Sequence, residues 1–76
     1  MQTTNAIKKL SKAGFEVTQN GNRYYATMNK SVVSFIDQYG RTICIKVRHE
    51  NDHDDLRSDY SAGVFCDNLT QAIKLV

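Results

Sequence analysis

Acidic side chains and two histidines gather in residues 49–60, with the sequence HENDHDDLRSDY. Carboxylates and imidazoles are ligand types that suit divalent cations. The spacing lacks the central glycine and the final glutamate of a calcium loop, and His49 and His53 have no neighbouring cysteine or histidine to complete a zinc site. We therefore predict no metal site and no cofactor, and we interpret this segment as a solvated acidic loop that contacts a partner.

A second arrangement that could do chemistry is a thiol beside an imidazole. Cys44 and His49 are a conceivable pair of nucleophile and base. However, Cys44 falls in the middle of an expected strand, and no glycine-rich loop or serine elbow supplies an oxyanion or phosphate site. We predict no catalytic residues and no enzyme activity. Cys44 and Cys66 are too few for a disulfide scaffold and are expected to be free thiols in a reducing compartment.

Charge divides the 76-residue chain into two unequal parts. Residues 1–48 contain eight Lys or Arg against two acidic residues, a net of +6, whereas residues 49–76 have a net of −4. Such a division is typical of an interaction surface, and it supports two hypotheses. In the first, the acidic loop meets a basic surface of another macromolecule, with Tyr60 as an anchor; the predicted contacts are Glu50, Asp52, Asp54, Asp55, Asp59 and Tyr60. In the alternative, the basic part binds nucleic acid through Lys8, Lys9, Lys12, Arg23, Lys46 and Arg48.

The elements that position these residues follow from local patterns. Helical spacing of apolar residues predicts a first helix that starts near Thr3 or Thr4, either of which can act as N-cap, and that ends at Gly14. Alternating residues 15–28 predict a hairpin that turns at Asn20-Gly21, with Val17 opposite Tyr24.

Residues 31–48 form the most strand-like stretch and predict a central hairpin. A three-residue loop after Asp37 places Val33 and Phe35 on the same face as Ile43 and Ile45. A two-residue Tyr39-Gly40 turn would pair Val32 and Ile36 with them instead. We prefer the first register because it buries the phenylalanine, although a one-residue slip reverses every side chain.

The last helix is predicted after Asp67 or Asn68, where Asn68 and Gln71 have the spacing of a capping box. The chain then reads as one domain, residues 1–76, with the order α-β-β-β-β-α. We expect an α+β fold in which both terminal helices pack on one face of an antiparallel four-stranded sheet. The other face is expected to display Tyr25, Arg23, Lys46, Arg48 and Cys44.

The C-terminal part of the chain is similar to a known family. The run from His53 to Tyr60, then Gly63-Val64-Phe65 and residues 68–73 (NLTQAI), resembles a small α+β domain of phages, plasmids and integrative elements. That domain occurs within or beside large polyvalent proteins. The resemblance spans about residues 31–76, and the matching positions are Asp59, Tyr60, Phe65, Asn68 and Ala72. It implies a genetic context rather than a mechanism. By analogy, a chain of this size that stands alone resembles the small inhibitors that phages direct against host defence, anti-CRISPR proteins among them.

Together these features predict a non-enzymatic, cytoplasmic protein that binds a host protein or a ribonucleoprotein such as a defence nuclease complex. The sequence contains no apolar run of the roughly 20 residues that span a bilayer, so we expect no membrane association. It leaves open a monomer or a homodimer paired through a strand edge.

Overall fold

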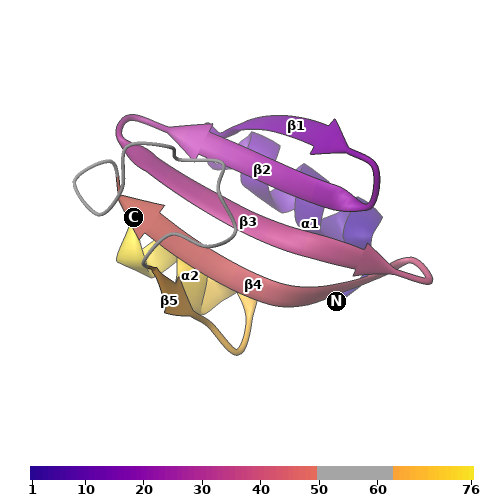
Figure 1. Ribbon diagram of the computed structural model, residues 1–76. Helices are drawn as coiled ribbons and strands as arrows, with labels where there is room; N and C mark the ends of the chain where they lie inside the picture. Colours follow the sequence, from indigo (N-terminus) through magenta and orange to yellow (C-terminus); the bar gives the residue numbers. More distant parts are fainter. Residues whose placement is uncertain (50–62) are drawn as a thin grey trace.

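A computed structural model describes residues 1–49 and 63–76 of the chain. They form a two-layer α+β structure with one antiparallel sheet and two helices (Figure 1). The elements are α1 (Thr3–Lys12), β1 (Glu16–Asn20), β2 (Arg23–Met28), β3 (Ser31–Gln38), β4 (Arg41–His49), β5 (Val64–Phe65) and α2 (Leu69–Leu75). The strands follow one another in the order β1-β2-β3-β4-β5. The expected four strands are present, and the short β5 adds a fifth.

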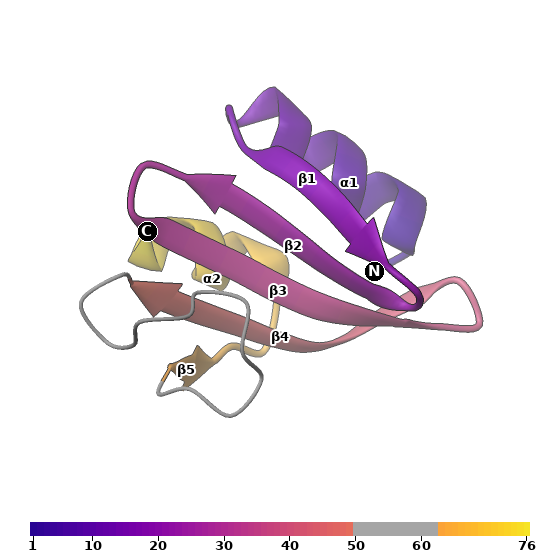
Figure 2. The same cartoon turned by 45° about the horizontal axis from the view of Figure 1, so that its top comes forward.

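Both helices lie on the same side of the sheet, and the core fills the space between the two layers (Figures 1 and 2). Each helix supplies a pair of small and large apolar side chains, and the central strands supply the rest. The buried cluster consists of Ala6, Leu10, Phe15, Ala26, Val33, Phe35, Ile45, Val47, Leu69 and Ala72. Because both helices lie on one side, the opposite side of the sheet has no helix among the described residues. We call this side the open face.

The first helix ends as its sequence predicts but begins differently. Gly14 has a φ of 102°, its N–H donates to the carbonyl of Ser11, and the N–H of Phe15 donates to the carbonyl of Leu10. These two bonds form a Schellman motif. At the other end, Gln2 is the N-cap and has no side-chain capping bond, so neither threonine caps the helix. Thr3 is buried instead, and its hydroxyl donates to the carboxylate of Asp37 on β3.

The first hairpin turns one residue later than predicted. Asn20 pairs with Arg23, so the turn residues are Gly21 and Asn22, and Val17 lies opposite Ala26 rather than Tyr24. Of these two residues, only Gly21 has a positive φ, of 64°. This is the arrangement of a type II′ turn. The shift changes each pairing by two residues. The division of side chains between the two faces is therefore as predicted.

The central hairpin combines the two registers that the sequence left open. The turn residues are Tyr39 and Gly40, with Gln38 opposite Arg41 and Ile36 opposite Ile43, so the predicted three-residue loop is wrong. If the register that pairs Ile36 with Ile43 continued without interruption, it would place Ile45 and Val47 on the open face.

A β-bulge restores the burial that motivated the other register. Phe35 is opposed by both Cys44 and Ile45, and beyond it Val33 pairs with Val47. Cys44 takes the left-handed conformation, with a φ of 53°, which costs about 1–2 kcal/mol in a residue other than glycine. Burying Ile45 and Val47 contributes about 1.5–3 kcal/mol each, which exceeds that cost.

Two short segments cover parts of the outer edge of β4. Near its start, the N–H of Thr42 donates to the carbonyl of Met1 over 2.9 Å, and the N–H of Thr3 donates to the carbonyl of Gly40 over 2.8 Å. Near its end, Val64 pairs with Val47, and the N–H of Cys66 donates to the carbonyl of Ile45 over 2.8 Å. Neither the bridge from the N-terminus nor the fifth strand has a periodic signal in the sequence.

Candidate functional site

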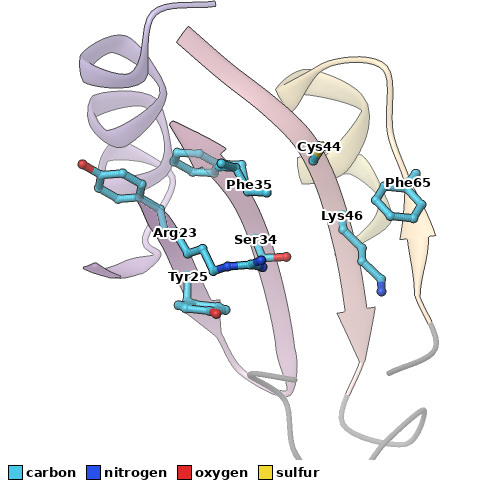
Figure 3. Close-up of a pocket in the computed structure, with 9 residues that line it drawn as sticks. Arg23, Tyr25, Ser34, Phe35, Cys44, Lys46 and Phe65 are labelled. Atoms are coloured by element: carbon cyan, nitrogen blue, oxygen red, sulfur yellow. The ribbon is translucent and has the colours of Figure 1, made fainter. Parts of the chain in front are cut away.

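The described part of the open face contains a pocket of about 160 Å³. It lies over the middle strands of the sheet and combines two cationic side chains with aromatic rings and a free thiol (Figure 3). Its described lining residues are Arg23, Tyr24, Tyr25, Ser34, Phe35, Ile36, Cys44, Lys46 and Phe65.

Strand register places four of these residues in one row across the sheet. Tyr25 pairs with Ser34, Ser34 with Lys46, and Lys46 with Phe65. Directly paired residues of antiparallel strands point to the same face, so the row presents an aromatic ring, a hydroxyl, an ammonium group and a second ring on the open face. Arg23 lies beside this row, two residues before Tyr25 on β2 and opposite Ile36, and Figure 3 shows its guanidinium group directed toward Ser34.

The exposed end of the row joins a cation to a ring. The Nζ atom of Lys46 lies 5.3 Å from the ring centroid of Phe65, within the range of a cation–π interaction. Phe65 is 68% exposed, so most of its ring is open to solvent. On the core side of the sheet, Tyr24 and Phe35 stack with their centroids 5.1 Å apart and an interplanar angle of 9°. The pocket therefore has an accessible aromatic edge at Phe65.

Gly63 allows β5 to approach β4 closely. A Cβ atom on this residue would lie 2.8 Å from Cγ of Arg48 and 2.9 Å from the carbonyl oxygen of Val47. Any larger residue would push β5, and with it Phe65, away from Lys46. Phe65 was not among the residues predicted for this site. The available signal was a glycine next to two apolar residues, Val64 and Phe65.

The residues predicted for the open face differ in their exposure to solvent. Cys44 is exposed at the bulge, and Arg23 and Lys46 are half-buried. Tyr25 and Arg48, in contrast, are only 8% and 4% exposed. The expectation that these two side chains would be displayed is wrong, because a position on the helix-free face does not by itself leave a side chain open to solvent.

The six basic residues of the nucleic-acid hypothesis divide into two groups on opposite sides of the sheet. Arg23 on β2 and Lys46 and Arg48 on β4 belong to the open face. The other three, Lys8, Lys9 and Lys12, are exposed on α1, in the helical layer. Because the sheet lies between the groups, one straight nucleic-acid segment cannot contact all six at once.

Lys9 has a structural contact of its own. Its Nζ atom donates a 2.6 Å hydrogen bond to the hydroxyl of Thr70, which ties α1 to the start of α2. The N-terminus of α2 is capped as predicted, since the side chain of Asn68 accepts from the N–H of Gln71 over 2.8 Å. The side chain of Gln71 in turn accepts from the N–H of Asp67.

The candidate partner-binding residues of the acidic loop lie outside the described residues. They are Glu50, Asp52, Asp54, Asp55, Asp59 and Tyr60. His53, the other histidine of that segment, also lies outside them.

The structure does not bring Cys44 and His49 together as a nucleophile and base. They lie on the same strand, and five residues of extended chain span about 16 Å. The Nδ1 atom of His49 is instead 2.8 Å from the hydroxyl oxygen of the buried Ser31. The other thiol, Cys66, is half-buried, and burial, with a smaller effect of the neighbouring Asp67, raises its pKa above the usual value.

No protein-family model matches the sequence, and comparisons with curated proteins and with solved structures find no similar chain. Neither helix of residues 1–49 and 63–76 is long and apolar enough to cross a membrane.

Proposed function

We propose that this chain is a small, non-enzymatic binding domain that holds a single-stranded nucleic acid on the open face of its sheet. The observation that carries the proposal is the row in which Lys46 and the exposed ring of Phe65 stand beside the pocket, with Arg23 at its other side. Single-strand binders combine cations that follow the phosphates with aromatic rings on which bases stack.

The geometry favours a single strand over a duplex. The open side of the Phe65 ring can stack only on a base whose own face is accessible, and bases within a duplex are stacked on each other. Arg23 and Lys46 would then contact the flanking phosphates. Both cations already take part in interactions within the chain, so phosphate would share or displace these contacts. We therefore expect modest affinity that depends strongly on salt.

The test is a fluorescence anisotropy titration of labelled single-stranded and duplex DNA and RNA over a series of salt concentrations. We expect single strands to bind, with an affinity that falls as salt rises. Phe65→Ala should weaken binding about 5- to 100-fold, the loss expected for one stacked base. Lys46→Gln should reduce the slope of log K against log salt by about 0.7, the value for one lost phosphate contact.

Lys8→Gln is the matched control, because it removes the same charge from an exposed position on α1 and leaves the open face intact. It should change binding far less than Lys46→Gln does. If no oligonucleotide binds at low salt, or if the two lysine variants lose binding equally, the proposed surface is wrong.

The acidic segment supports a second candidate, a protein partner with a basic surface, such as a host defence nuclease complex in a phage or mobile-element setting. It rests on the net charge of −4 over residues 49–76. Changing acidic residues to amides separates the two candidates, because it should abolish capture of such a partner while nucleic-acid binding persists. The positions to change are Glu50, Asp52, Asp54, Asp55 and Asp59.

A further inference from the structure

The two edges of the sheet differ in how many of their backbone hydrogen-bonding groups are left unpaired. On one side, the outer edge of β4 is partly covered by the N-terminal residues and by the two-residue strand β5. On the other side, β1 is a terminal strand of five residues, all paired with β2 in regular register. Among the described residues, β1 is therefore the longest strand with an unpaired side.

The hairpin geometry defines which groups of β1 point outward. Asn20 and Arg23 flank the two-residue turn, and such a pair exchanges both of its backbone hydrogen bonds. Bonding then alternates along the strand, so Thr18 and Glu16 also bond to β2. The N–H and carbonyl groups of Val17 and Gln19 consequently point outward at the edge of the sheet, away from β2.

Exposed edge strands usually contain a feature that prevents pairing with a strand of another molecule, such as a proline, a lysine or a β-bulge. The sequence of β1, EVTQN, contains neither proline nor lysine, and its register with β2 is uninterrupted. Its single charge, Glu16, is the only feature that opposes association with another strand.

We propose that β1 pairs antiparallel with β1 of a second copy of this chain, with the twofold axis at Thr18. In this register Val17 of one copy lies opposite Gln19 of the other, and the four outward groups on each strand make four N–H···O bonds in total. Thr18 faces its own counterpart, a favourable cross-strand pair. Glu16 lies opposite the neutral Asn20, so no like charges face each other.

The pairing joins two five-stranded sheets into one continuous sheet. Because the twofold axis is perpendicular to the sheet, the open faces of both copies lie on the same side. A ligand long enough to reach both pockets would gain avidity from the dimer. Only one short strand per copy is buried, well below the roughly 1,200 Å² of a standard stable interface, so the dimer forms at high protein concentration.

Sedimentation velocity together with amide NMR spectra, over a dilution series from about 10 μM to about 1 mM, tests the proposal. The mean sedimentation coefficient should rise with concentration. Amide shifts that depend on concentration should be largest for Val17 and Gln19, whose N–H groups point outward.

Thr18→Lys places two ammonium groups opposite each other at the twofold axis and should keep the protein monomeric throughout the series. Thr27→Lys is the matched control, since Thr27 pairs with Glu16 on the same face but belongs to β2, and it should associate as the unmodified chain does. A chain that stays monomeric at the highest concentration overturns the proposal. So do equal effects of the two lysine variants, or concentration-dependent shifts centred on another element.

Discussion

The hydrogen bond between Thr3 and Asp37 ties the start of α1 to β3 and leads to a quantitative prediction. Thr3 is only 6% exposed, and its hydroxyl donates to a carboxylate 34 residues away in the sequence. Hydrogen bonds to charged groups contribute about 1.5–3 kcal/mol to stability, and we expect about 1–2 kcal/mol here because Asp37 is half-buried. For a domain of this size, each kcal/mol shifts the Tm by about 4–8 °C.

A double-mutant cycle with Thr3→Val and Asp37→Ala isolates this energy. Each variant and the double variant would be unfolded with urea and followed by circular dichroism. Asp37→Ala should cost more than Thr3→Val, because it also removes a negative charge beside the positive end of the helix dipole. The coupling between the two changes should be about 1–2 kcal/mol, in the stabilising direction.

Thr4→Val is the matched control, since Thr4 is exposed one residue further along the same helix. It should change the free energy of unfolding by less than about 0.5 kcal/mol, as is usual at the surface. A coupling energy below about 0.3 kcal/mol, within the error of additivity, would show that the hydrogen bond between Thr3 and Asp37 does not stabilise the fold.

Three further predictions concern single sites. The hydroxyl oxygen of Thr42 is buried without a hydrogen-bond partner among the described residues, so Thr42→Val should raise stability by about 1 kcal/mol in the same urea assay; a loss would mean that the hydroxyl is bonded. Gly63→Ala should lower the Tm, because its Cβ would lie 2.9 Å from the carbonyl oxygen of Val47, and an unchanged Tm would contradict this close approach. Burial raises the pKa of Cys66, so its thiolate forms only at higher pH. Iodoacetamide should therefore alkylate the exposed Cys44 before Cys66 at neutral pH. Equal alkylation rates of the two thiols at neutral pH would contradict this prediction.

Local signals in the sequence predict most of the scaffold. Gly14 ends α1, Asn68 and Gln71 cap α2, and alternation assigns the side chains of the first hairpin to the correct faces. Each of these features depends on residues within a few positions of each other, where propensity and steric limits act directly. The α+β layering follows, because two apolar helix stripes have only one sheet face to cover.

What the sequence does not predict depends on distant contacts. Tyr39 and Cys44 both adopt positive φ, which no side-chain preference signals. Their conformations are set by the need to bury Phe35 and Ile45 on one face while keeping the tight turn. The candidate site is likewise a product of pairing, since Phe65 meets Lys46 only when β5 joins the sheet.

The most direct test of the proposed function is an NMR titration of the labelled chain with a short single-stranded oligonucleotide at low salt. We predict that amide shift changes will map to the open-face row, at Ser34, Lys46 and Phe65, and that they will reverse when salt is added. Changes centred instead on Lys8 and Lys12 of α1, or no changes at all, would contradict the account.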